Sequence, residues 1–337
     1  MSFRDVSSYI LIFYLLYPKL CYSSEINPPP ILKKYIKNSH FNPNHYQWAR
    51  GAFADATAEE KQQWGEIKKY LNDCQVQDKK NQENKLNDLK IEFSHLVLAP
   101  YQNGICRSVL FFVKNVNLFR SYSDLSKVLT VADDQLNAIL FAVKEMHNRQ
   151  KTITLQDDDL IKLLAEEDQV DRDTYIEYGM KNKFDNDVQK IVTNTLGNYL
   201  SEEDSERISQ FEHIIEKKGW KYFTTSPRDV NQAAFLIIQH VTSDMAFQVS
   251  ASNHILTWYQ NNKLTGQQYT EFKDRIDLYL HGKQTFGTQF QCISGKWVPF
   301  PIKTPSNVDH ERKRFGLIRL RLYAESLKKA YGEKCEG

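Results

Sequence analysis

The chain has 337 residues and a mass of 39.5 kDa, with 41% hydrophobic and 26% charged residues. This composition is ordinary for a globular protein and leaves room for one large or two modest domains, each with a sizeable core. The 44 basic and 42 acidic residues give a formal net charge of +2. This near balance argues against a nucleic-acid-binding surface, because such surfaces concentrate positive charge.

Residues 1–23 have the pattern of a secretory signal peptide. An apolar run from Tyr9 to Tyr17 follows Arg4 and precedes Cys21-Tyr-Ser23, which resembles a small-residue cleavage box. We expect cleavage to leave a mature chain that starts near Ser24 and is exported to the periplasm or the medium. An uncleaved anchor and a cytosolic chain with a buried N-terminal helix are the alternatives. Beyond this segment no apolar run is long enough for a membrane span.

Export would place the remaining cysteines in an oxidising compartment. Cleavage leaves Cys74, Cys106, Cys292 and Cys335, an even number that permits two disulfides. The polar segment between Cys74 and Cys106 allows the chain to double back, so we expect these two to pair. Free thiols packed as small apolar residues are the alternative. No two cysteines stand at C-x-x-C spacing, which argues against a thiolate metal site.

Helical signals dominate residues 31–150. Thr57-Ala-Glu-Glu60 is a capping box at the start of a helix. Residues 75–90 are polar and rich in lysine, which fits either a solvated helix or a linker, and residues 110–119 fit either a strand or a buried helix. Apolar residues recur at helical spacing in two stretches of this region, at Trp64, Ile67, Leu71 and Cys74 and at Leu136, Ile139, Leu140 and Val143.

The first helices of residues 151–325 are acidic. One is predicted over residues 158–178, where Asp168 and Arg172 stand four apart and can meet on one helix face. The default interpretation of that pair is a surface ion pair of little energetic value. A second helix is predicted from Ser201 to Lys218, and Gly219 gives it a left-handed end.

The later elements are marked by caps and turns. A buried helix begins at Ser226-Pro227 and ends near His240, and Ser243 or Asp244 is expected to cap the next helix. Thr265-Gly-Gln-Gln268 is a further capping box, and residues 286–300 read as a β-hairpin. We therefore expect a mainly α fold, in which a helical N-terminal region (31–150) packs on a helical C-terminal domain (151–325) with a small β-hairpin.

Polar residues interrupt the apolar segments between Gln239 and Gln289. Buried polar groups are costly unless they are hydrogen-bonded, so we expect His240, Asp244, Arg275 and Gln289 to converge on a polar pocket. His240 is the candidate general base, because imidazole titrates near neutral pH.

Each remaining polar residue of this region is assigned a role. Asp244 or Asp168 would orient the imidazole of His240. Arg275 or Arg172 would bind an anionic or carbonyl group bidentately. The amide side chains that would contact a polar substrate, such as a sugar or a peptide, are Gln284, Gln289 and Gln248.

Together these motifs resemble an uncharacterised bacterial family, a domain of unknown function, over about residues 155–320. The shared pattern is Q-H-x-x-x-D-x-x-F-Q from Gln239, D-R at Asp274-Arg275 and G-x-Q-x-x-G-T-Q from Gly282. Glu167-Asp168-Gln169 with Arg172 matches the family's upstream motif. The resemblance implies no particular activity, because the family has no established one.

Two functions remain open. The first is an exported binding or structural module that takes a small polar ligand or a component of the cell envelope. The alternative is a hydrolase-like enzyme that uses a His-Asp general base on a sugar or peptide. We expect no metal site, because no second histidine motif accompanies His240 and Asp244. We expect no cofactor either, since the chain has no P-loop, no dinucleotide fingerprint and no nucleophile elbow.

Overall fold

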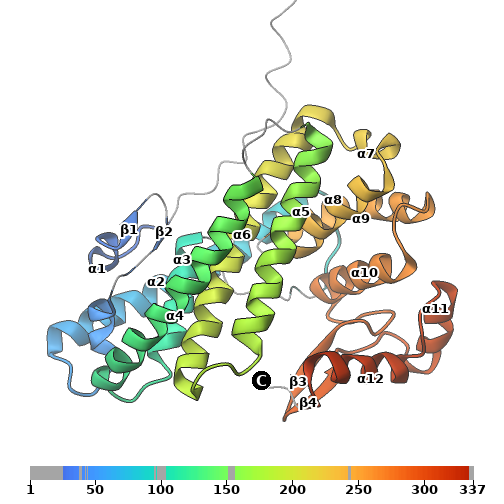
Figure 1. The fold of residues 1–337 in the computed structure, drawn as a ribbon. Helices are drawn as coiled ribbons and strands as arrows, with labels where there is room; N and C mark the ends of the chain where they lie inside the picture. The colour runs from blue at the N-terminus through green and yellow to red at the C-terminus, as the bar shows by residue number, and fades with distance from the viewer. Residues whose placement is uncertain are drawn as a thin grey trace, which may run out of the picture.

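The computed structural model describes residues 26–37, 40–41, 43, 45–94, 96, 104–150, 156–241 and 244–333. The protein is mainly α, as predicted, and long helices dominate its shape (Figure 1). The expected signal peptide, residues 1–23, lies outside the described residues. Within the described part, no helix is both long and apolar enough to cross a membrane.

The N-terminal elements confirm the capping box and settle two open assignments. Thr57 accepts a hydrogen bond from the Glu60 amide at 3.2 Å, and the Glu60 carboxylate accepts one from the Thr57 amide at 2.8 Å. Residues 75–88 continue the helix that starts there, and most of 110–119 is helical. The elements are α1 (Pro30–Lys33), β1 (Ile36–Lys37), β2 (His40–Phe41), the 3-10 helix η1 (Gln47–Ala52), α2 (Ala58–Asp88), α3 (Gly104–Val116) and α4 (Tyr122–Gln150).

The C-terminal elements follow the predicted order. Gly282 ends a helix at φ 67°, and the hairpin turn has Ser294 and Gly295 at φ 49° and 76°. The elements are α5 (Asp157–Thr174), the π-helix η2 (Tyr175–Met180), α6 (Asn186–Lys218), α7 (Tyr222–Thr225), α8 (Arg228–His240), α9 (Met245–Gln260), α10 (Gly266–His281), β3 (Phe290–Ile293), β4 (Lys296–Pro299), the 3-10 helix η3 (Pro305–Asn307), α11 (Val308–Arg314) and α12 (Leu320–Tyr331).

Helix α6 corrects one prediction. The helix expected to start at Ser201 begins fifteen residues earlier, at Asn186. Ser201-Glu-Glu-Asp204 has the composition of a helix start, but Leu196 and Val192, which lie earlier in the same helix, are buried. Packing of this earlier stretch against α3 and α4 overrides the local capping signal.

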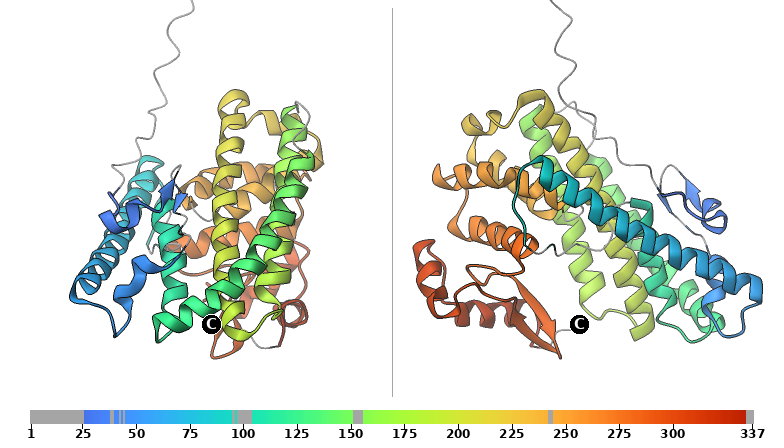
Figure 2. Two further views of the ribbon diagram at one scale, coloured as in Figure 1. Left: turned by 60° about the vertical axis from the view of Figure 1, so that its left-hand side comes forward. Right: turned by 180° about the vertical axis from the view of Figure 1, so that it is seen from behind.

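Two apolar clusters form the core, and α6 belongs to both. Its first half packs with α2, α3 and α4, and its second half packs with α5, α8, α9 and α10. Figure 2 shows α2 crossing the back of the long helices. Leu86 of α2 belongs to the cluster that the second half of α6 forms with α5, α8, α9 and α10. The upstream helices and the predicted C-terminal domain are therefore joined by shared apolar packing.

A disulfide joins α2 to α3. Cys74 and Cys106 are bonded, with their Cα atoms 6.3 Å apart, so the predicted pair is confirmed. Cys292 is disulfide-bonded as well. Cys335, the other cysteine expected to remain after cleavage, lies outside the described residues. The alternative of free thiols is thereby excluded for Cys74, Cys106 and Cys292.

Candidate functional site

A network of buried charged residues lies where α4, α5, α6 and α8 meet. These helices contact one another directly, and the charged face of α5 lies between the other three. The network comprises His147 on α4, Glu167, Asp168, Asp171 and Arg172 on α5, Glu203, Asp204 and Arg207 on α6, and His240 on α8.

His240 stands at the end of α8 and is held by Asp168. Its Nδ1 lies 2.8 Å from Asp168 Oδ2, and Arg172 Nε lies 3.0 Å from Asp168 Oδ1. Burial alone would raise the pKa of Asp168, but the hydrogen bond and charge of His240, with Arg172, lower it. Arg172 Nε also lies 2.9 Å from His240 Nδ1, so an N–H donor and a carboxylate oxygen both face this nitrogen. The arginine favours a lone pair on Nδ1, whereas the carboxylate favours a proton there. The side chain of His240 is 16% exposed.

Asp204 links the two arginines of the network. Arg172 Nη2 lies 2.9 Å from both oxygens of Asp204, and Arg207 Nη2 donates to the same carboxylate at 3.0 Å. Arg207 also donates to Asp171 Oδ2 at 2.6 Å. Burial raises the pKa of Asp204, and the two guanidiniums oppose that rise. These contacts fix the position of α5 along α6.

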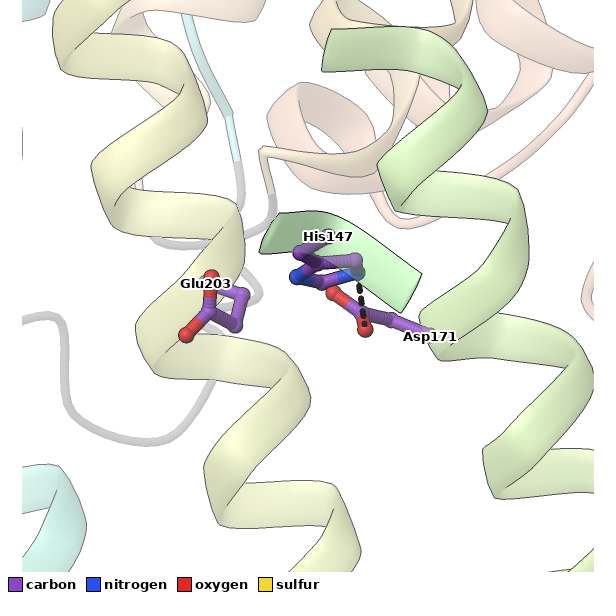
Figure 3. Close-up of side chains that lie close together, drawn as sticks. All are labelled: His147, Asp171 and Glu203. Carbon is purple, nitrogen blue, oxygen red and sulfur yellow. Dashed lines mark ion pairs between the residues drawn. The ribbon is translucent and has the colours of Figure 1, made fainter. Parts of the chain in front are cut away.

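His147 closes the other end of the network. Its Nε2 lies 3.2 Å from Asp171 Oδ1, and Glu203 faces the same space from α6 (Figure 3). The close side-chain contact with Asp171 and the charge of that carboxylate raise the pKa of His147, although burial opposes this. The imidazole nitrogen and the carboxylate oxygens are atoms that can bind a divalent cation.

Arg275 approaches the network from α10. Its Nη1 donates to the carbonyl of Gln239, next to His240. Gln248 Nε2 donates to the carbonyls of Ile238 and Gln239, each at 2.8 Å, so both side chains cap the end of α8. Among the described residues, no carboxylate forms an ion pair with Arg275. Burial and the charge of Arg172 lower the pKa of Arg275 to about 10.

Asp244 occupies a different place from the one expected. It caps α9 by accepting from the Phe247 amide at 3.0 Å, and its Oδ2 lies 2.5 Å from Lys85 Nζ on α2. The break between helices α8 and α9 directs the Asp244 carboxylate toward α2 rather than toward His240. Of the two carboxylates expected to orient the imidazole, Asp168 does so and Asp244 does not.

Gln284 and Gln289 hold the hairpin rather than join His240. Gln284 is fully buried, and its amide bonds to the backbone of Gln289 and Phe300 at 2.8–2.9 Å. Gln289 Nε2 donates to the Glu271 carbonyl at 3.2 Å. Asp274 completes this arrangement by accepting from three amides of residues 285–288. The predicted convergence is thus corrected: these side chains satisfy backbone groups of α10 and of the segments that flank the hairpin.

Surface hollows lie elsewhere on the molecule. One is bordered by Tyr122 at the start of α4, and another by Leu160 and His213 on α5 and α6. Neither includes His240, Arg275 or His147 in its lining.

The sequence contained a signal for the network residues that we did not predict. Ile161, Leu164 and the predicted Asp168 are buried, and Asp171 continues the same helical face. Arg207 likewise falls on the buried face of α6, before Phe211. Charged residues that continue an apolar stripe indicate a buried ionic network, because buried charges are otherwise rare.

The chain belongs to a family of unknown function (DUF6624), whose model matches residues 154–336. This confirms the resemblance found over about residues 155–320. No curated protein and no solved structure matches the chain. The matched segment includes every network residue on α5, α6 and α8 together with Arg275, whereas His147 lies upstream of it.

Arg207→Ala should destabilise the protein by about 3–5 kcal/mol, because it leaves two buried carboxylates without their shared guanidinium. Arg207 is 3% exposed and contacts both Asp171 and Asp204. Chemical denaturation followed by circular dichroism would measure the loss. Arg321→Ala is the matched control, since that side chain is 80% exposed and pairs only within α12. Equal effects of the two substitutions would contradict a structural role for the network.

Proposed function

We propose that the protein binds a small anionic ligand at the end of α8, with Arg275 as its principal partner and His240 beside it. The observation that supports this most directly is a guanidinium without an ion-pair partner among the described residues. Arg275 donates to the backbone carbonyl of Gln239 and lies near a second arginine, Arg172, while Glu271 acts on it through its charge without forming an ion pair. Such a cation is costly unless an anion joins it.

The neighbouring groups suit a carboxylate or a phosphate. A guanidinium offers a planar set of donors that matches either group bidentately. His240 remains partly exposed, and its Nε2 makes no hydrogen bond among the described residues. Arg172 is already occupied by Asp168 and Asp204, so Arg275 is the guanidinium available to a ligand. This assigns the binding function to Arg275 rather than to Arg172, Gln284 or Gln289.

Arg275→Gln should weaken the binding of inorganic phosphate or succinate by roughly ten- to a hundredfold. This corresponds to the loss of one charge-assisted contact of about 1.5–3 kcal/mol. Isothermal titration calorimetry at low ionic strength would measure it, with potassium chloride added to test for nonspecific screening. Arg321→Gln on the exposed face of α12 is the matched control and should leave binding unchanged. An Arg275→Gln variant that binds as the wild type does would refute the proposal.

A second candidate is acid–base catalysis at the same place. It is favoured by the contact of the buried Asp168 with Nδ1 of His240, which holds an imidazole that is 16% exposed. A base held in this way can activate water, and Arg275 would stabilise the developing negative charge.

Chromogenic carboxylic and phosphoric esters distinguish catalysis from binding alone. A catalyst should lose about a hundredfold or more in rate on His240→Gln. Binding of phosphate should then fall much less than the rate, since Arg275 is unchanged. If the wild type hydrolyses none of these esters, the binding function stands alone for this substrate set.

Export is part of the proposal. The disulfide between Cys74 and Cys106 supports it, because disulfides persist in oxidising compartments and are rare in the cytosol. Mass spectrometry of the protein recovered from its native host should find a mature chain that starts near Ser24. An intact Met1 on a protein from the cytosolic fraction would contradict export.

A further inference from the structure

We propose that His147, Asp171 and Glu203 bind a divalent transition-metal ion, such as Zn²⁺ or Mn²⁺. The three side chains come from α4, α5 and α6 and lie close together, with His147 between Asp171 and Glu203 (Figure 3). They lie at the end of the network away from His240. The site is distinct from the anion site at Arg275 and does not depend on it.

The spacing of the ligand atoms fits one ion. His147 Nε2 and Asp171 Oδ1 lie 3.2 Å apart. Two ligands bound tetrahedrally to zinc lie about 3.3 Å from each other, given metal–ligand distances of about 2.0–2.1 Å. The candidate ligand atoms of all three residues lie within 4.8 Å of one another. Glu203 is half-buried, and rotation of its side chain can bring the carboxylate to an ion held by the other two.

Unsatisfied buried atoms point to the same space. His147 and Asp171 are 6% and 2% exposed, yet Nε2 of the first and Oδ1 of the second make no hydrogen bond. Their close approach therefore lacks the alignment of a hydrogen bond. Oε1 of Glu167 is also buried without a partner, and its charge acts on His147. Buried polar atoms are normally paired, so an ion that two of them ligate directly accounts for this arrangement.

The charge of the network also favours a cation. Glu167, Asp168 and Asp171 are buried carboxylates, and Asp171 pairs with the guanidinium of Arg207. The charges of Asp171, Glu167 and Glu203 all act on His147. These negative charges favour a cation beside them.

The ligand set indicates the class of ion. One imidazole nitrogen with carboxylate oxygens suits zinc, manganese and similar ions, whereas calcium and magnesium prefer oxygen ligands alone. Three protein ligands leave a position for water. Because His147 lies upstream of residues 154–336, the site needs both the family segment and the preceding helix.

Calorimetric titration of tag-free, EDTA-treated protein with zinc chloride and manganese chloride tests the proposal. The wild type should bind one equivalent of at least one of these ions. His147→Gln and Glu203→Gln should each weaken that binding by about tenfold or more. Glu203→Gln carries the test if His147→Gln does not fold, since Glu203 is only half-buried. Circular dichroism and thermal unfolding establish which variants are folded.

His213→Gln is the matched control. His213 also lies beside a glutamate, Glu216, but both side chains are 79% exposed. This variant should bind the ion as the wild type does. The proposal is overturned if the wild type binds neither ion, if folded Glu203→Gln keeps full affinity, or if His213→Gln removes the binding.

Discussion

Asp168 and Asp171 stand on the face of α5 that packs into the protein, and a buried carboxylate is costly unless charges or hydrogen bonds compensate it. Arg172 and Arg207 provide that compensation, and both contact Asp204 on α6. A sliding movement of α5 along α6 would break these contacts together. The ionic network therefore specifies one arrangement of the central helices, whereas apolar packing alone tolerates several.

Compensation of buried polar groups by partners on another helix also joins the upstream helix α2 to the segment that matches the family model. Lys85 on α2 pairs with Asp244, which caps α9. Gln82, also on α2 and 2% exposed, accepts hydrogen bonds from the Ala246 amide and the Tyr279 hydroxyl. Two early residues of α9 thus meet polar side chains of α2. These contacts pair polar groups of the segment over 154–336 with side chains of α2, which lies upstream of it.

The parts of the fold that sequence reasoning predicted are local. Thr265 and Gly282 mark helix ends through backbone geometry that depends on a few neighbouring residues. The helix start predicted at Ser201 was wrong for the same reason. A favourable cap composition gives no information about how the preceding residues pack against other helices. Contacts such as that of Asp171 with His147 depend on the register of α4 against α5. A single sequence supports the burial of Asp171 through its helical face, but it does not identify the partner.

Hydrogen bonds and ion pairs connect the two ends of the network without a gap. The path from one imidazole to the other runs through Asp168, Arg172, Asp204, Arg207 and Asp171. An added cation beside Asp171 would compete with Arg207 for that carboxylate, and Arg207 would then interact more strongly with Asp204. Asp204 would in turn be less available to Arg172, which lies beside Arg275. Since coupling between binding sites is reciprocal, an anion at Arg275 would act on the cation end through the same shared carboxylate.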